Sequence, residues 1–366
     1  MTKKIAINTG GGDAPGLNAV IRAVVLAAYK RGWECYGIRD GYNGILSPHE
    51  YPDGGIMTLD RMAVRGITHL GGTILGTTNR GNPLQYPVQD ENGQWTTIDR
   101  SGEIMAAFKE RGFDALIAIG GDGSLTIANE LSKRNGIKVI GVPKTIDNDL
   151  LHTTATFGFD TAVSFATECI DRLHSTAESH RRIIVVEVMG RYAGWIALDS
   201  GVASTADVIL IPEIPYDILK VAEKIREREA LGRHFSIVVV AEGAKPVGGE
   251  LSIRGQSLGQ AERLGGVGEK VAAALGELTG QETRSVVLGH LLRGGKPTNT
   301  DRLLSLRFGA AAVRALDEGL SGVMVALNPP RVDYVPLEQV AGAMKLVPLD
   351  CDTILTARDL GISLGD

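Results

Sequence analysis

Residues 142–149, VPKTIDND, place a lysine, a threonine and two aspartates on one short loop directly after the apolar run IKVIG. Pro143 has no backbone N–H to donate, so we expect the strand to end there and the loop to turn outward. A lysine can bind an anion, and an aspartate can accept a proton. Thr, Asp and Asn also form ordinary turns by bonding to their own backbone, so the loop alone leaves both interpretations open.

Two glycine-rich segments also follow short apolar runs: GGGDAPG at 10–16 and GGDGS at 120–124. Consecutive backbone N–H groups and a helix N-terminus favour an anion such as phosphate at this kind of turn. The first segment is neither a Walker A loop nor G-x-G-x-x-G, since Pro15 stands where the last glycine would be. Asp122 would repel a phosphate unless a cation lay between them, which predicts it as a Mg²⁺ ligand, direct or through water.

With phosphates and Mg²⁺ over these two loops, Asp147 becomes the predicted acceptor of a proton from an attacking hydroxyl. Phosphoryl transfer depends mainly on positioning, charge neutralisation and one well-placed carboxylate. Arginines, which bind phosphate through a fork of N–H groups, belong on the acceptor side. Arginines stand beside several predicted strand ends: Arg182, Arg191, Arg284 and Arg293. Each arginine taken alone is typical of a solvent-exposed surface residue. Their recurrence beside strand ends favours a binding site for an anionic small molecule.

The elements that must position these residues recur as a short β-branched run, a glycine-rich turn and a helical pattern. The helical pattern at 17–32 has one apolar face and Gly32 as a predicted C-cap. The predicted strands are KKIAINT, DALIAIG, IKVIGV, RIIVVEV, DVILIP, FSIVVVAEG, SVVLGH and VMVALN. Because these runs are apolar throughout, they predict an α/β fold with doubly wound parallel sheets. Ligands of such sheets bind beyond the carboxyl ends of the strands, where we expect every motif above to lie.

Two polar segments resemble surface insertions. Residues 85–100 predict a hairpin that turns at Asn92-Gly93, and residues 245–268 are rich in glycine. The second segment contains GQSLG around Ser257, which matches the G-x-S-x-G pattern of hydrolases. That motif requires a buried strand directly before the serine, and here a polar stretch precedes it, so we do not favour a hydrolase.

Composition excludes several other classes of protein. Of the 366 residues, 43% are hydrophobic, which supports a packed core, and the net charge of −5 gives no basic footprint for nucleic acid. No apolar run approaches the roughly 20 residues of a membrane span, and MTKKIAINTGGG reads as a first strand and not as a signal peptide. Three scattered cysteines fit a reducing compartment. We therefore predict a cytoplasmic protein with neither nucleic acid nor a membrane as partner.

Six motifs in order resemble the phosphofructokinase family over nearly the whole chain: GGDAPG, GGTILG, GGDGS, PKTIDND, MGRYAG and LGHLLRGG. The resemblance implies two similar doubly wound α/β domains with the active site in the cleft between them. It implies a donor domain of residues 1–157 plus about 292–342, and a sugar-phosphate domain of residues 158–291 plus about 343–366. The implied reaction is the glycolytic phosphorylation of fructose 6-phosphate at its 1-hydroxyl, by a homo-oligomer that is a tetramer or a dimer.

The resemblance also implies roles for single residues. Asp147 matches the catalytic base, Thr145 lies beside the transferred phosphate, and Arg191 is the third catalytic residue. The matches on the donor side are Gly12, Asn79, Arg80, Gly121, Asp122, Gly123 and Ser124, with Asp122 as the Mg²⁺ residue. The matches on the sugar side are Thr145, Ile146, Asp147, Met189, Gly190, Arg191, Glu242, His290, Leu291, Leu292 and Arg293. Arg182 and Arg284 match arginines that reach into the site of a neighbouring subunit.

The sequence departs from the family pattern at three places. Asn79 stands where many ATP-dependent members have an arginine, with Arg80 one place later, and Leu26 replaces an arginine of the allosteric members. The donor position is mixed: Gly123 is typical of ATP-dependent members, whereas Lys144 is typical of pyrophosphate-dependent ones. A side chain at position 123 would crowd the α-phosphate of a nucleotide, so Gly123 favours ATP as the donor.

Three alternatives follow from the same residues. Lys144 keeps open a pyrophosphate-dependent fructose-6-phosphate phosphotransferase. GGDG also marks kinases of other acceptors, although the MGR and HLLR segments are not expected there. A non-catalytic nucleotide-sensing homologue would be expected to lack the catalytic aspartate, and Asp147 is present.

Overall fold

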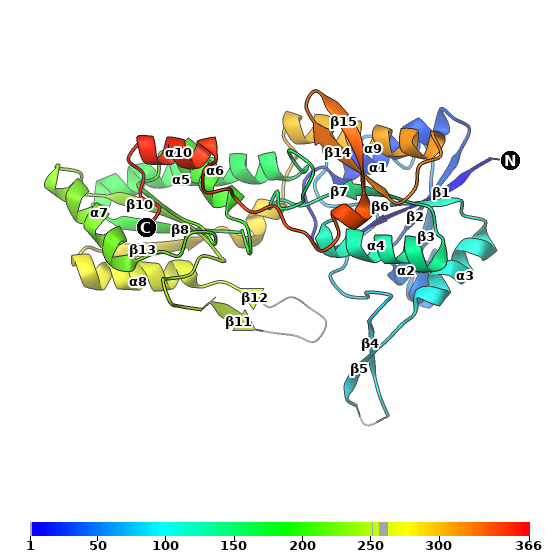
Figure 1. Ribbon diagram of the computed structural model, residues 1–366, viewed down its shortest axis with the longest axis horizontal. Coiled ribbons are helices and arrows are strands. Elements are labelled where there is room, and N and C mark those ends of the chain that lie inside the picture. The colour runs from blue at the N-terminus through cyan, green and yellow to red at the C-terminus, as the bar shows by residue number, and fades with distance from the viewer. Residues whose placement is uncertain (1, 92, 251, 256–262) are drawn as a thin grey trace.

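The protein is described by a computed structural model that covers residues 2–91, 93–250, 252–255 and 263–366. Two sheets form two lobes that lie next to each other along the long axis of the molecule (Figure 1). One sheet has 7 strands in the order β15-β14-β7-β6-β1-β2-β3, and the other has 4 strands in the order β13-β8-β10-β9. The predicted α/β class is confirmed.

The larger sheet is parallel at its centre and antiparallel at both edges. β1 pairs in parallel with β2 and β6, while β3 and β15 run antiparallel to β2 and β14. Its strands are β1 (Lys4–Thr9), β2 (Glu34–Ile38), β3 (Ile56–Leu59), β6 (Ala115–Gly120), β7 (Val139–Pro143), β14 (Val323–Asn328) and β15 (Arg331–Pro336). The predicted strands omit the half-exposed edge strands β3 and β15, and also β2, which lies next to the edge strand β3. None of the three has a continuous apolar run.

The smaller sheet is parallel throughout, with β8 and β10 at its centre. Its strands are β8 (Ile183–Val188), β9 (Val208–Leu210), β10 (Ser236–Ala241) and β13 (Thr283–Val287). The apolar run SVVLGH predicts a strand that reaches His290, which is wrong. β13 ends at Val287 because Gly289 takes a left-handed backbone angle, φ 47°, and opens the 3₁₀ helix η2 (Gly289–Arg293).

Helices cover both faces of each sheet, so the central strands are buried on both sides. In β1, Ile5 and Ile7 pack beneath α1 and α9, while Ala6 belongs to the cluster beneath α3 and α4. On the smaller sheet, α5, α6 and α10 cover one face, and α7 and α8 cover the other (Figure 1). The helices are α1 (Leu17–Tyr29), α2 (Asn43–Leu46), α3 (Ser101–Arg111), α4 (Asp122–Asn135), α5 (Phe159–His180), α6 (Trp195–Ala203), α7 (Ile218–Ala230), α8 (Val267–Thr279), α9 (Asn299–Asp317) and α10 (Asp352–Asp359), with the 3₁₀ helices η1 (Pro48–Glu50) and η3 (Leu337–Gln339).

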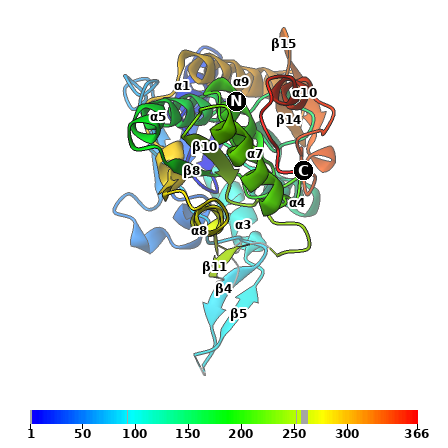
Figure 2. The same ribbon diagram turned by 90° about the vertical axis from the view of Figure 1, so that its left-hand side faces the viewer.

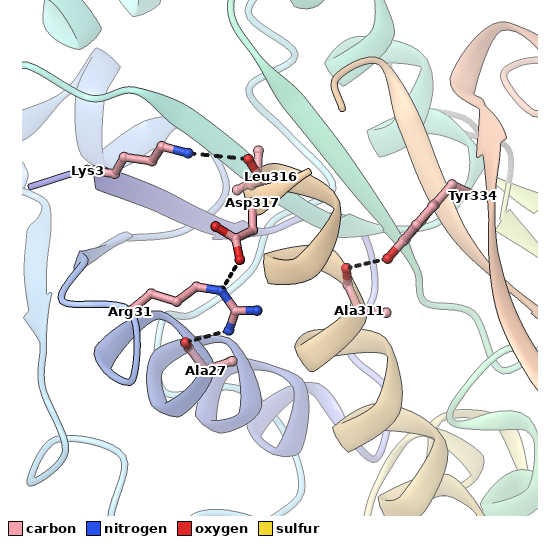
Figure 3. A network of polar contacts seen from close by, with 7 residues as sticks. All are labelled: Lys3, Ala27, Arg31, Ala311, Leu316, Asp317 and Tyr334. Carbon is pink, nitrogen blue, oxygen red and sulfur yellow. Dashed lines mark hydrogen bonds and ion pairs between the residues drawn. The ribbon is translucent and has the colours of Figure 1, made fainter. Parts of the chain in front are cut away.

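The packing of α9 on α1 returns the chain from the smaller lobe to the larger sheet. Polar contacts hold the ends of this pair (Figure 3): Arg31 Nε donates to Asp317 Oδ2 at 2.8 Å, and Lys3 Nζ donates to Leu316 O at 3.4 Å. Tyr334 of β15 donates its hydroxyl to Ala311 O at 3.4 Å. α9 is thereby tied to α1, to the chain just before β1 and to the sheet edge. Buried residues from both ends of the chain share one hydrophobic core.

Two hairpins extend from the body of the molecule. β4 (Tyr86–Gln89) pairs antiparallel with β5 (Trp95–Ile98), which confirms the predicted hairpin, and the arm projects in both views (Figures 1 and 2). Asn92, at its predicted turn, lies outside the described residues. β11 (Ile253–Gly255) and β12 (Arg263–Leu264) form the second pair. Ser257 of the G-x-S-x-G match also lies outside the described residues.

The first helix is shorter than its predicted range of 17–32. It ends at Tyr29 with Lys30 as C-cap, and Gly32 follows with φ 71° and donates its N–H to Tyr29 O at 2.9 Å. Gly32 therefore closes the turn after the helix. Across the described residues, none of the helices combines the length and the apolar character that spanning a membrane requires.

Candidate active site

A cavity of about 990 Å³ lies where the carboxyl ends of β1, β6 and β7 face the segments that follow β8 and β10. Both lobes line it. Most of the residues singled out in the sequence contribute to its wall: Gly12, Asn79, Arg80, Gly121, Asp122, Gly123, Ser124, Lys144, Thr145, Asp147, Met189, Arg191, Glu242, His290 and Arg293. The topology thus gathers motifs that are separated by up to about 280 positions, because parallel strands place their carboxyl ends on one edge.

Other predicted site residues do not line this cavity. Ile146 and Leu292 are buried in the core beside it, and Leu291 is 62% exposed. Gly190 has φ 144°, and a Cβ there would lie 2.9 Å from Ala193 O, so this glycine shapes the turn that carries Arg191. These residues support their neighbours through backbone and packing.

The second glycine segment forms the wall at a helix N-terminus. Gly121 is the N-cap residue of α4, so the first N–H groups of that helix, at Asp122, Gly123 and Ser124, belong to the cavity wall. The first N–H groups of a helix have no partner within the helix and attract anions. A Cβ on Gly123 would have no atom within 4 Å, so the space in front of this residue is open.

The first glycine segment contributes less to anion binding than the sequence suggests. Gly10 and Gly11 already donate their N–H groups to Ile119 O at 2.9 Å and Thr78 O at 3.1 Å. A Cβ on Gly10 would lie 2.5 Å from Ser124 Oγ, and one on Gly12 would lie 2.5 Å from Arg293 Nη1. The glycines therefore allow the close approach of Ser124 and of Arg293.

Arg293 joins the two lobes at this first loop, and Lys144 contacts the same loop from within the larger lobe. Lys144 Nζ donates to Gly12 O, and Arg293 Nη1 donates to the neighbouring Asp13 O at 3.1 Å. Burial lowers the pKa of Lys144 to about 8, helped by the positive charge of Arg293. These two cations, one from each lobe, contact neighbouring carbonyl groups of the loop and line the cavity, where they are available to an anionic ligand.

Three carboxyl groups in or beside the cavity wall have raised pKa values. Burial, and then the charge of Asp149, raises the pKa of Asp147 to about 7. Burial also raises the pKa of Asp149 and, together with Glu187, that of Glu242. Within the described part of the chain, the buried Asp147 Oδ1 has no hydrogen-bond partner, so it is free to accept a proton or a hydrogen bond from a ligand. Perturbed pKa values and an unpaired buried oxygen are typical of functional sites.

The loop around Asp147 is held by short-range contacts. Asp147 N donates to Thr145 Oγ1 at 3.0 Å, and Thr156 Oγ1 donates to Thr145 O at 2.7 Å. Thr145 therefore sets the turn on which Asp147 is carried. The same threonine makes the turn and lines the cavity, so the contacts agree with the turn interpretation of VPKTIDND, and the functional interpretation stays a prediction.

The predicted arginines divide into two groups. Arg191 and Arg293 line the cavity, and among the described residues the buried Nε of Arg191 has no partner. Arg182 and Arg284 do not line it, because they stand at the amino ends of β8 and β13, where both contact Glu282. The expectation that every motif lies at a carboxyl strand end is wrong for these two. Arg182 and Arg191 flank the same strand, β8, at its opposite ends.

Some lining residues are not among the predicted ones. Gly41 and Tyr42 follow β2, and Asn8 lies within β1. The sequence of β2 has no clear strand pattern. The glycine-containing turn after it could therefore not be placed beside the other loops from the sequence alone. Asp149 belongs to the quoted loop and also lines the cavity, but the sequence alone gives no means of assigning it a role.

The residues present can accommodate Mg²⁺ only in company with a ligand. Among the described residues, no group of three or more His, Cys, Asp or Glu side chains is arranged to hold a metal. Mg²⁺ commonly binds one or two carboxylates and completes its shell with water and phosphate oxygens, so a lone aspartate beside a phosphate site is compatible with it. Asp122 is such a residue, although its Oδ1 already accepts the N–H of Gly342 at 2.8 Å.

Comparisons with known proteins identify the family of this chain. The family model described as Phosphofructokinase matches residues 4–316. The "ATP-dependent 6-phosphofructokinase 2" of Clostridium perfringens (strain 13 / Type A) is 51% identical over 100% of this chain and 99% of its own. The "Pyrophosphate--fructose 6-phosphate 1-phosphotransferase" of Streptomyces coelicolor is 48% identical over 94% of this chain and 96% of its own.

A solved structure shares the architecture. The Pichia pastoris phosphofructokinase in the T-state is 32% identical with a TM-score of 0.78, over 93% of this chain. This chain spans 35% of the length of that protein, so the likeness concerns one part of a longer polypeptide.

Proposed function

Since the chain belongs to the phosphofructokinase family, we propose that it transfers the terminal phosphate of ATP to the 1-hydroxyl of fructose 6-phosphate, a step of glycolysis. The observation that carries the choice of ATP is the open space in front of Gly123 at the start of α4. The triphosphate would lie against the N–H groups of this helix turn, and the absence of a side chain at position 123 leaves room for its α-phosphate.

Asp147 is the proposed general base. Its unpaired Oδ1 accepts the proton of the 1-hydroxyl as that oxygen attacks the terminal phosphate, and its raised pKa places it near neutrality, where a base is effective. Thr145 and Lys144 stand on the same loop, so the transferred phosphate would pass between a hydroxyl and a cation. Arg191 stabilises negative charge in the transition state through its unpaired Nε.

The acceptor is held by groups from the smaller lobe. Glu242 would accept hydrogen bonds from sugar hydroxyls, and Met189 would contact the sugar. His290 and Arg293 would bind the 6-phosphate, with Arg293 also holding the glycine loop of the donor lobe. Asp122 would hold Mg²⁺, which neutralises charge on the donor phosphates when it is bound.

A second candidate donor is pyrophosphate, and Lys144 favours it. This lysine is buried beside the first glycine loop and adds positive charge where the transferred phosphates would lie. Its side chain does not fill the space of a nucleotide, since its ammonium group reaches Gly12 and no atom lies within 4 Å of a Cβ on Gly123. We therefore keep ATP as the proposed donor.

We further propose the two domains at the boundaries given above, a cytoplasmic location, and a tetramer or dimer in which Arg182 and Arg284 complete the site of a neighbouring subunit. Both arginines lie away from the cavity of their own chain, so they could bind a substrate only in another copy. This supports the proposed sharing of sites between subunits.

A comparison of the two donors tests the proposed function. The purified chain is mixed with fructose 6-phosphate and Mg²⁺, and fructose 1,6-bisphosphate is measured with ATP or with pyrophosphate. We expect turnover with ATP to exceed that with pyrophosphate. Turnover with pyrophosphate and none with ATP would overturn the choice of donor, and none with either would overturn the proposed reaction.

Gly123→Asp tests the structural basis of that choice. A carboxylate in the open space would repel and crowd the nucleotide, and kcat/KM for ATP should fall by roughly tenfold or more. Gly102→Asp is the matched control, because Gly102 also has no atom within 4 Å of an added Cβ and lies on α3, away from the cavity. Equal use of ATP by both variants would show that position 123 does not face the donor.

A further inference from the structure

A short segment after η3, residues 342–347, crosses behind the loop that carries Asp147. Lys345 N donates to Asp149 O at 2.8 Å, and Met344 forms an isolated antiparallel bridge with Leu150. The segment is thus hydrogen-bonded to the end of VPKTIDND, although it lies almost 200 positions further along the chain. None of its residues lines the cavity itself.

The side chain of Lys345 reaches the same loop. Its ammonium group donates to Asn148 Oδ1 at 2.8 Å, to Thr153 O at 3.0 Å and to Thr154 O at 3.1 Å. An ammonium group has three hydrogens to donate, so these acceptors account for all of them. Burial lowers the pKa of Lys345 to about 8, while Asp149 and Asp199 oppose this shift.

The main acceptor, Asn148, stands between the two aspartates in a left-handed conformation with φ 51°. A residue other than glycine adopts this region at a cost, so the surrounding contacts must hold it. Asn148 is 6% exposed, and its Oδ1 accepts hydrogen bonds from Lys345 and from Thr156 N at 3.2 Å. These two donors therefore maintain the turn that directs Asp147 into the cavity.

The other contacts of the segment lead to the acceptor lobe. Trp195 Nε1 donates to Lys345 O at 3.0 Å, and the ammonium group lies 5.6 Å from the centre of the Trp195 ring. Val347 N donates to Glu213 Oε1 at 2.9 Å, and the same carboxylate accepts the N–H of Gly194 at 3.0 Å. Gly194 and Trp195 follow directly on the loop that carries Arg191, so Lys345 stands between the base and the acceptor loop.

From these contacts we propose that Lys345 is a positioning residue for phosphoryl transfer: through Asn148 it holds the turn of Asp147 in the orientation that accepts the substrate proton. This inference rests on the proposed function. Lys345 does not touch the cavity, so it should affect the rate of the chemical step more than the binding of either substrate. A base misplaced by about 1 Å can cost about a hundredfold in rate.

The test uses three variants of the full-length chain: Lys345→Met, Asn148→Ala and the double variant. We expect each single change to lower kcat by roughly ten to a hundredfold, with both KM values within about threefold of the wild type. The kcat of the double variant should be only slightly lower than that of the more damaged single variant, because both changes remove the same hydrogen bond between Lys345 and Asn148. Lys109→Met, an exposed lysine on α3, is the matched control and should keep the wild-type kcat.

Circular dichroism and size-exclusion chromatography show whether each variant is folded. If Lys345→Met does not fold, Asn148→Ala alone tests the same link, because it keeps the lysine and its two carbonyl acceptors. A folded variant with wild-type kcat, a loss confined to KM, or single losses that multiply in the double variant would each overturn the inference. If the wild-type chain turns over its substrates and a variant gives one of these results, only the inference about Lys345 is contradicted. If the wild-type chain uses neither donor, the proposed function is contradicted as well.

Discussion

The two halves of the cavity differ in how much of the site one chain supplies. On the side of the larger sheet, the start of α4, Lys144 and Asp147 all face the cavity, and the loop of Asp147 is held from behind by residues of the same chain. On the side of the smaller sheet, Arg191 faces the cavity, whereas Arg182 stands at the other end of the same strand and contacts Glu282.

Under the proposed assembly, the chemical step and the binding of the acceptor would depend on the other subunits in different ways. The proposed base and the proposed donor site are formed within one chain, so their contributions should persist in any oligomeric state. In the proposed oligomer, the arginines at the amino ends of β8 and β13 would contribute across a subunit boundary. A change in the first region should therefore lower kcat, and a change in the second should raise KM for the sugar phosphate.

The largest effect is expected for Asp147→Asn. The amide keeps the size of the side chain but cannot take the proton, so kcat should fall by about two to four orders of magnitude while substrate binding changes little. Steady-state kinetics with both substrates measures this. Unchanged turnover would show that another group is the base.

Asp147→Asn should also make the folded protein more stable at pH 8. Burial raises the pKa of this carboxyl, so its charge is unfavourable in the folded state; the folded state gains stability when the group is neutral and loses it as the pH rises through about 7. The midpoint of thermal unfolding should therefore rise in the variant. A lower midpoint would mean that the ionised carboxylate has a favourable partner in the folded chain.

The sequence predicts the side of the cavity formed by the larger sheet better than the side formed by the smaller sheet, for a physical reason. GGDGS and PKTIDND each follow a continuous apolar run, and parallel strands bring such ends together whatever their separation along the chain. Arg182 directly precedes β8, and Arg284 is the second residue of β13, so strand direction places both at the amino ends of the strands, opposite the cavity. The role of Lys345 depends on a contact between distant segments, which no local pattern contains.

The next largest effect is expected for Arg284→Ala and Arg182→Ala. Loss of a charge-assisted hydrogen bond to phosphate costs about 1.5–3 kcal/mol, which corresponds to a rise of roughly tenfold or more in KM for fructose 6-phosphate. The KM for ATP should stay the same. Arg172→Ala is the control, since Arg172 also pairs with a glutamate of its own chain, Glu168, on an exposed helix face.

Mixing two variants with different defects separates a shared site from a local one. Asp147→Asn subunits lack the base, and Arg284→Ala subunits lack the proposed arginine for a neighbour. If sites are shared, a mixed oligomer contains some sites with both residues intact, and activity at low fructose 6-phosphate exceeds the sum of the separate proteins. Additive activity after subunit exchange would place Arg284 outside the acceptor site.

The smallest effect is expected from a change of pH. It should affect the two sides of the cavity differently, because Asp147 and Lys144 titrate near neutral pH and the arginines do not. The base must be ionised, so kcat/KM should fall as the pH drops through the Asp147 pKa of about 7, roughly tenfold between pH 8 and pH 6. Above about pH 8, Lys144 loses its proton, and KM for the donor should rise. Arginine keeps its charge throughout this range, so removing Arg284 should raise KM for the sugar phosphate by the same factor at each pH. A factor that changes with pH would mean that the arginine acts through a titrating neighbour, and the two halves would then not be independent.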